Sequence, residues 1–235
     1  MACHDRGVRV HRSFAFVDLS GFTALTEVEG DERAVSVLST FRSLARDICS
    51  RRGVRIAKWL GDGAMLVGVD TTPLVATTLE LQLASTLGGV PVPIRCGLSA
   101  DHVILHEGDD YIGHAVNVAA RLCDLAPGGE VWAGAHIAEH LPPWGAVLSE
   151  QETLVRGLEH PLWVSRLGLA ELDGAVIADP VCGIPLTLAV ADNVARDALR
   201  NPVLFCSESC RDTWEHRPKE RPDGQGSLRI PLIGT

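Results

Sequence analysis

The stretch FAFVDLSGFTALTE, Phe14–Glu27, decides how the rest of the chain is interpreted. It begins as an apolar run with strand character, and the run ends on an acid, Asp18. A polar turn through Ser20 and Gly21 follows at once. An acid in this place lies at the rigid end of a strand with room for a ligand in front of it, which makes Asp18 a candidate metal ligand.

Size and charge limit the classes of protein to consider. The chain has 235 residues, enough for one domain of ordinary size with a small appendage. Its formal net charge is -9, and no dense block of lysine and arginine offers a surface for nucleic acid. The apolar runs are far shorter than the ~20 residues that span a bilayer, and the first residues lack a signal segment. We therefore expect a cytoplasmic protein with neither a nucleic-acid nor a membrane partner.

Helical and strand patterns mix along the chain, which indicates an α+β or α/β fold. The spacing of apolar residues predicts helices over 31–48, with Asp31 as N-cap, over 72–87, and over 114–126. Strands are predicted over 92–108, 129–134 and 160–167. Two short apolar runs joined across Gly61, Asp62 and Gly63 predict a β-hairpin, with Asp62 in its turn.

Asp18 and Asp62 together suggest a metal site. Either aspartate alone is more commonly a turn or cap residue. Two acids that flank one sheet are, however, the ligands that Mg²⁺ or Mn²⁺ prefers, with water and phosphate oxygens completing the shell. Two such ions ~3.5 to 4 Å apart can hold the attacking and leaving oxygens of a phosphoryl displacement.

A second candidate pair is Asn117 and Arg121, four residues apart and therefore on one face of a predicted helix. Such a face is ordinarily just solvated. Here the pair interrupts an apolar set, so it shares a side with partly buried residues. A guanidinium in that position suits the charge that develops on a reacting phosphorus centre.

The chain from about Phe14 to Leu167 resembles the catalytic domain of the class III adenylate and guanylate cyclases. The motifs FVDLSGFT, KWLGDG and DYIGHAVNVAARL carry the resemblance. It implies a cyclase homology domain, an α/β sandwich of ferredoxin-like or palm type. All six functional residues of the family have counterparts at the family's spacing: the metal-binding Asp18 and Asp62, the adenine-reading Lys58 and Asp110, the ribose-positioning Asn117, and Arg121, which stabilises the pentavalent phosphate.

The resemblance implies an adenylate cyclase that converts ATP to 3',5'-cyclic AMP and pyrophosphate with two Mg²⁺ or Mn²⁺ ions per site. It also implies a head-to-tail homodimer with composite sites, in which the metal aspartates come from one protomer and the other four residues from its partner. Two alternatives stay open. One is a guanylate cyclase, and the other is a non-catalytic cyclase-fold scaffold with a metal-sensing tail.

The cysteines fall into two groups. Four are scattered, and we expect them to be reduced thiols that are mostly buried: Cys3, Cys49, Cys96 and Cys123. The other three, Cys182, Cys206 and Cys210, lie in the motifs DPVCG and FCSESC, which resemble the YHS domain. Three thiolates suit Zn²⁺ or Cu⁺, and His216 is a candidate fourth ligand. The alternative is a small domain in which the cysteines only pack.

These patterns predict four segments. Residues 1–168 form the cyclase domain, residues 169–178 a linker, residues 179–218 the YHS-like metal-binding module, and residues 219–235 a flexible tail. The module departs from its family in having Ile184 where methionine is common, and in lacking tyrosines before FCS.

Overall fold

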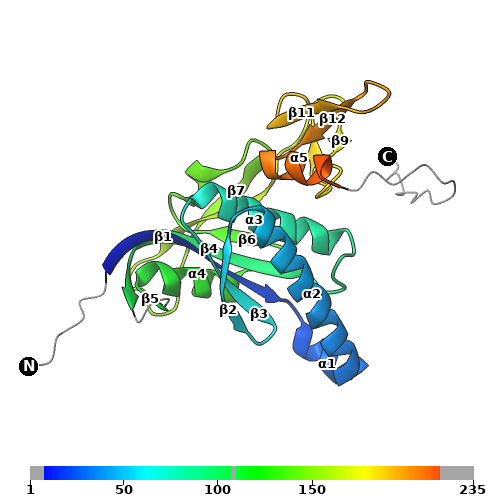
Figure 1. The fold of residues 1–235 in the computed structure, drawn as a ribbon. Helices are drawn as coiled ribbons and strands as arrows, with labels where there is room; N and C mark the ends of the chain where they lie inside the picture. Colours follow the sequence, from blue (N-terminus) through cyan, green and yellow to red (C-terminus); the bar gives the residue numbers. More distant parts are fainter. Residues whose placement is uncertain (1–7, 107–109, 218–235) are drawn as a thin grey trace, which may run out of the picture.

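The computed structural model describes residues 8–106 and 110–217. Within that part of the chain, the largest feature is an eight-stranded mixed sheet (Figure 1). Seven strands follow the order β2 (Arg55–Leu60), β3 (Gly63–Gly68), β1 (Val8–Leu19), β4 (Ile94–His106), β6 (Val131–Ala133), β8 (Leu162–Leu169) and β7 (Gly145–Thr153). The eighth, β5 (Asp110–Ile112), pairs with β4 outside this path. The predicted α+β class is confirmed.

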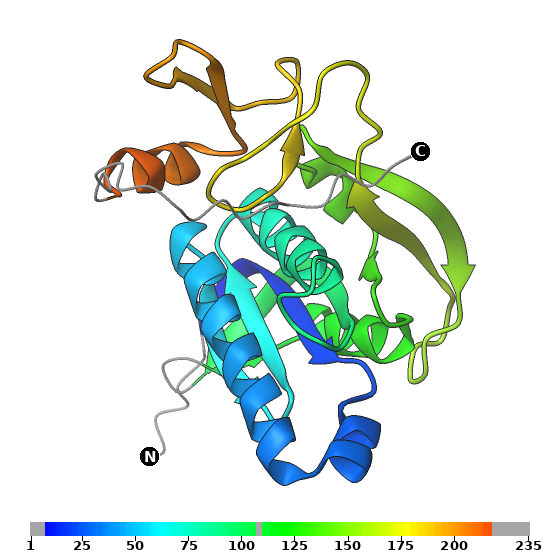
Figure 2. The same ribbon diagram turned by 90° about the vertical axis from the view of Figure 1, so that its right-hand side faces the viewer.

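Helices cover both faces of the sheet: α2 (Asp31–Arg51), α3 (Thr71–Thr86) and α4 (His114–Leu125). The alternation of side chains along β1 separates the two layers. Ala15 and Val17 belong to the apolar core shared with α2 and α3, whereas Phe14 packs in a separate cluster with Ala119 of α4. Figure 2 shows α2 and α3 side by side on one face of the strands. The result is the expected helix-and-sheet sandwich.

The start of α2 corrects the N-cap prediction. Asp31 was expected to cap the helix, but it is the first helical residue, and Gly30 occupies the N-cap position. Gly30 has a φ of 84°, which a residue with a side chain adopts only at a cost. It is needed because a short helix, α1 (Phe22–Glu29), precedes α2 directly and the chain must turn between them. The carboxylate of Asp31 still lies in the first turn, where the helix dipole favours it.

Strand β7 was not predicted, and its exposure explains why. Its residues are exposed or intermediate along the whole strand, so its sequence carries no alternation of apolar and polar residues. It forms an edge strand that pairs with β8, with an irregularity between Val147 and Ser149. The predicted strand at 160–167, the hairpin across Asp62, and the helix of α4 are all present.

Three of the four scattered cysteines are free and buried, as expected: Cys49, Cys96 and Cys123. Cys3 lies outside the described residues. The tail predicted over 219–235 lies outside them too.

The C-terminal segment forms a small unit of two hairpins and a helix: β9 (Ile177–Ala178) with β10 (Pro185–Leu186), β11 (Asn193–Arg196) with β12 (Pro202–Phe205), and α5 (Glu208–Glu215). We call it the C-terminal module. Its buried Ile184, Leu186 and Phe205 belong to the same apolar cluster as residues of α2 and α3. The hydrophobic core is therefore continuous between the sheet domain and the module.

Replacing Gly97 by alanine is expected to destabilise the fold by about 3 kcal/mol, the upper end of the usual cost of overpacking a core. A Cβ at Gly97 would lie 2.1 Å from the backbone N of Cys123 and 2.3 Å from the carbonyl O of Ala119, which would force β4 and α4 apart. Gly134→Ala is the matched control, because its Cβ would meet its nearest neighbour at 3.6 Å. Urea unfolding of both variants measures the difference, and equal midpoints would contradict this close approach.

Candidate functional site

Asp18 and Asp62 lie together at the end of the β1–β3 pair. In the antiparallel register Asp18 is opposite Gly63, so Asp62, which directly precedes Gly63, lies beside it. Both aspartates line one open cleft of about 430 Å³. The other lining residues come from β1, β2, β3, β4 and α4: Phe16, Val17, Leu60, Gly63, Ala64, Arg95, Ala120, Cys123 and Asp124.

Gly63 makes this closeness possible. A Cβ there would lie 2.7 Å from the carbonyl O of Val17 and 3.3 Å from Oδ1 of Asp18. Any side chain at position 63 would therefore push the hairpin turn away from β1. On the other side of Asp18, Gly21 has a φ of 83° and turns the chain from the strand into α1.

The charges in the cleft are incompletely balanced. Arg95 donates from Nε and Nη2 to a single oxygen, Oδ2 of Asp18, at 2.8 and 2.5 Å. Burial and the negative charge of Asp18 raise the pKa of Asp62. With Asp124, three acidic residues line the cleft against one guanidinium, that of Arg95. A hard divalent cation would neutralise part of this excess negative charge. The donor set therefore fits Mg²⁺ or Mn²⁺.

Lys58 and Asp110 are brought together from β2 and β5. The Nζ of Lys58 donates to Oδ1 of Asp110 at 2.7 Å, and each side chain is about half exposed, at 46% and 49%. The hydrogen bond and charge of Lys58 lower the pKa of Asp110. The pair thus offers a cationic donor and an anionic acceptor side by side, within reach of a ligand from solvent.

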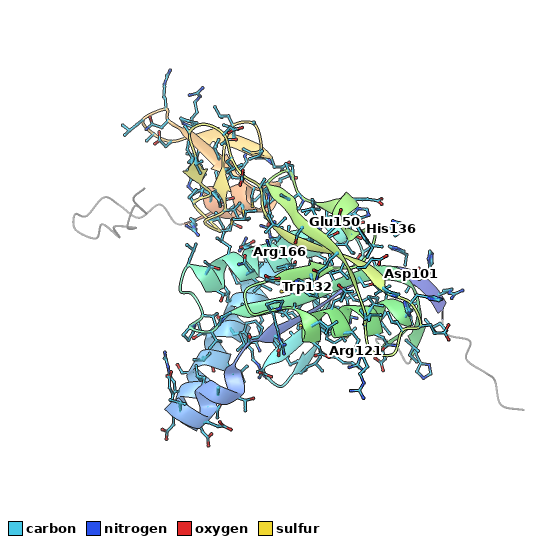
Figure 3. The ribbon with its side chains drawn as sticks, turned by 180° about the vertical axis from the view of Figure 1, so that it is seen from behind. Asp101, Arg121, Trp132, His136, Glu150 and Arg166 are labelled. Carbon is cyan, nitrogen blue, oxygen red and sulfur yellow. The ribbon has the colours of Figure 1, made fainter. Side chains whose placement is uncertain are left out.

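Asn117 and Arg121 line a second cavity, of about 290 Å³, between α4 and the loop after β7. Figure 3 shows Arg121 projecting outward from α4. Arg156, on that loop, lines the same cavity. Sequence reasoning missed Arg156 because it missed β7, and a single arginine before Gly157 in a polar loop is a weak signal. The cavity therefore has two guanidinium groups and one amide.

The two cavities share α4 but no lining residue. Asp18 and Asp62 lie in one, and Asn117 and Arg121 in the other. Within one chain the structure thus brings together Asp18 with Asp62, Lys58 with Asp110, and Asn117 with Arg121, as three separate pairs.

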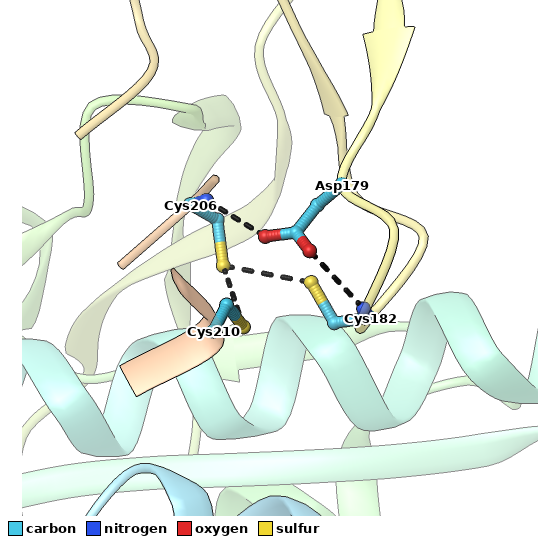
Figure 4. A group of neighbouring side chains, drawn as sticks. All are labelled: Asp179, Cys182, Cys206 and Cys210. Atoms are coloured by element: carbon cyan, nitrogen blue, oxygen red, sulfur yellow. Dashed lines mark hydrogen bonds between the residues drawn. The ribbon is translucent and has the colours of Figure 1, made fainter. Parts of the chain in front are cut away.

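The cysteines of the C-terminal module form a second candidate site. Cys182, Cys206 and Cys210 gather with Asp179, whose side chain sequence reasoning did not include, and their possible ligand atoms all lie within 4.8 Å of one another. Figure 4 shows the four side chains pointing toward one another. His216 is exposed, and its Nδ1 lies 2.7 Å from the carbonyl O of Asp212 in its own helix. It does not join the cluster found among the described residues.

Known proteins similar in sequence include cyclases. An uncharacterised protein of Mycobacterium tuberculosis is 31% identical over 163 residues, which is 69% of this chain and 43% of that protein. A pH-sensitive adenylate cyclase of the same species is 35% identical over 128 residues, 54% of this chain and 32% of that protein. The chain thus spans less than half the length of these curated relatives. No protein-family model matches it.

Solved structures give the fold. The adenylyl cyclase CyaB from P. aeruginosa superposes with a TM-score of 0.62 at 21% identity, covering 72% of this chain and 98% of that one. The guanylyl cyclase Cya2 gives 0.61 at 23% identity, covering 71% and 96%. The sheet domain has the class III cyclase fold. None of the described helices is both long and apolar enough to cross a bilayer.

Asp62→Asn is expected to raise the free energy of unfolding at neutral pH, measured by urea unfolding, by less than about 1 kcal/mol because the cleft is open to solvent. The raised pKa of Asp62 means that its ionisation opposes folding. The gain should therefore be complete at neutral pH, shrink as the pH falls through the folded-state pKa, and vanish below the unfolded-state pKa. The exposed Asp173→Asn is the control. A gain that persists at acid pH would show that the charge of Asp62 is not its cause.

Proposed function

We propose that the chain is a cytoplasmic class III adenylate cyclase, a phosphorus-oxygen lyase of signal transduction that converts ATP to 3',5'-cyclic AMP and pyrophosphate. The observation that carries the proposal is the cleft shared by Asp18 and Asp62, where two carboxylates meet at the mouth of a rigid β-sheet. The sequence similarity to an adenylate cyclase of Mycobacterium tuberculosis supports the same reaction.

The chemistry needs positioning and charge from the protein. Mg²⁺ or Mn²⁺ ions bound to Asp18 and Asp62 would supply the positive charge that activates the 3'-hydroxyl and stabilises pyrophosphate. Arg95 holds Asp18 in place through two hydrogen bonds to one oxygen, which leaves Oδ1 for a ligand. Arg121 and Arg156 offer guanidinium charge to the phosphates, and the amide of Asn117 suits a ribose oxygen.

The preference for adenine is assigned from the hydrogen-bonding pattern of the base and of the pair Lys58 and Asp110. Adenine presents an acceptor at N1 and a donor in its amino group, whereas guanine presents the reverse at those positions. Lys58 donates and Asp110 accepts, so the pair matches adenine. Because the two side chains are half exposed and already adjacent, a base can replace their mutual hydrogen bond without a change in the backbone.

The active form is proposed to be a head-to-tail homodimer. In a single chain, the carboxylate cleft and the cavity of Asn117, Arg121 and Arg156 are lined by different residues. A partner protomer that faces the cleft with its own α4 would complete the site. Two-fold symmetry then gives two equivalent sites per dimer.

The first test is turnover of ATP and, separately, GTP by the purified chain with Mn²⁺, detecting cyclic nucleotide and pyrophosphate. Cyclic AMP should form preferentially. Asp18→Ala should lower kcat by at least about 100-fold, since it removes a ligand of the catalytic cations, while the far-ultraviolet circular dichroism stays unchanged. Lys58→Glu should reduce turnover of ATP more than that of GTP.

Three results would count against this function. Full turnover by Asp18→Ala would refute the metal assignment. Preference for GTP would favour a guanylate cyclase. No cyclic product from a folded dimer would favour the non-catalytic scaffold.

The composite site predicts complementation between two inactive variants. A mixed dimer of Asp18→Ala and Arg121→Ala protomers has one site with both defects and one site with neither. Random pairing of equal amounts should therefore restore about one quarter of wild-type activity. Asp18→Ala mixed with Asp62→Ala is the control and should stay inactive, because each site then lacks one aspartate. Failure of the first mixture to recover, with subunit exchange verified, would contradict the shared site.

A further inference from the structure

The thiol cluster of the C-terminal module has the geometry of a preformed ligand set. The Sγ of Cys206 lies 3.5 Å from that of Cys182 and 3.6 Å from that of Cys210. The three come from different places in the module: the turn after β9, the end of β12, and the first turn of α5. Cys206 and Cys210 are buried, and Cys182 is partly buried. Packing of apolar side chains alone does not require three sulfurs from three segments to meet at one point.

Asp179 organises this set and is engaged through both of its oxygens. Its Oδ1 accepts from the backbone N–H groups of Val181 and Cys182, at 2.8 and 3.4 Å, and its Oδ2 accepts from that of Cys206 at 2.8 Å. The carboxylate is 1% exposed, so these three hydrogen bonds offset its burial. Asp179 therefore ties together the two loops that carry Cys182 and Cys206, and the sulfurs remain as the ligands.

Two arginines of the sheet domain donate to the sulfurs. Arg51 donates from Nη1 to the Sγ of Cys210 at 3.4 Å, and Arg52 donates from Nη2 to the Sγ of Cys206 at 3.2 Å. Both arginines also pair with Glu80 of α3, which is 2% exposed. Arg51 also contacts Asp47 at 3.4 Å, so two carboxylates accompany the two arginines, but the charged groups that touch the sulfurs are the guanidinium groups. A group of free thiols would not need their positive charge, whereas thiolates would.

We propose that Cys182, Cys206 and Cys210 bind one Zn²⁺ ion as three thiolates, with an external fourth ligand, and that the guanidinium groups of Arg51 and Arg52 stabilise the thiolates of Cys210 and Cys206. Thiols that are protonated before binding release their protons to solvent. This site is separate from the carboxylate cleft, and the proposal does not depend on cyclase activity.

Charge favours Zn²⁺ over Cu⁺ here. Three thiolates with Zn²⁺ carry one net negative charge, and the buried carboxylate of Asp179 adds a second beside them. With Cu⁺ the same ligands would leave one further negative charge in a buried place, at a cost. Zn²⁺ prefers four ligands, and sites with three protein ligands keep one open position. A cavity of about 320 Å³, which Cys206, Arg51 and Arg52 line, has room for the fourth.

The proposal is tested on the full chain under reducing conditions, because the core is continuous between the module and the sheet domain. Native mass spectrometry should find one Zn²⁺ per chain. Co²⁺ in its place should show thiolate-to-metal charge-transfer absorption. Cys182→Ser should weaken Zn²⁺ binding by more than about 100-fold, the upper range for loss of an outer-shell partner. Since Cys182 is only partly buried, this variant should keep its fold, which circular dichroism checks.

Cys49→Ala is the matched control, a buried cysteine of α2 outside the cluster, and should bind Zn²⁺ like the wild type. No uptake of Zn²⁺ by the wild type, unchanged affinity in Cys182→Ser, or equal loss in Cys49→Ala would each overturn the site. Preferential binding of Cu⁺ in direct competition would overturn the choice of ion.

The role of the arginines has its own test. Arg51→Gln should weaken Zn²⁺ binding roughly tenfold, the effect of one charge a few ångströms from a thiolate. Arg51→Lys keeps the charge and should bind within a few-fold of the wild type. Equal affinities in the two variants, both verified as folded, would overturn the role given to the arginine.

Discussion

The antiparallel pairing of β1 with β3 is the constraint on which the candidate active site depends. It aligns Asp18 with Gly63, and because position 63 lacks a side chain, the hairpin turn approaches β1 closely enough for Asp62 to join Asp18. The price of that approach is electrostatic repulsion between two carboxylates, which Arg95 offsets only in part. The backbone of the sheet thus holds two carboxylates close together, an arrangement whose negative charge a divalent cation would reduce.

Much of this arrangement was predictable because its signals are local. Short windows of sequence are enough to recognise the apolar run that ends on Asp18 and the hairpin turn that contains Asp62. The helical spacing of Asn117 and Arg121 is likewise local, and the structure places both on one cavity. The three cysteines of the C-terminal module could be grouped by their nearness in sequence, and they do converge.

The elements that sequence reasoning missed depend on contacts between distant residues. Strand β7 is exposed and acquires its conformation from pairing with β8. Its sequence therefore has no alternation of apolar and polar residues that would predict a strand. Arg156 matters only because that strand places its loop beside α4. Asp179 resembled an ordinary acid before a proline, and its role comes from a backbone N–H group 27 residues away. Glu80, inside α3, is explained only by Arg51 and Arg52 at the C-terminal end of α2.

Helix α2 connects the two candidate sites mechanically. Near its C-terminal end Arg51 contacts the thiol cluster, and nine residues earlier, about 14 Å along the axis, Nη2 of Arg42 donates to the carbonyl O of Gly61 at 3.0 Å. Gly61 directly precedes Asp62. One helix therefore contacts both the thiol cluster and the hairpin turn that carries Asp62, so the positions of the two candidate sites relative to each other are fixed by a single element of secondary structure.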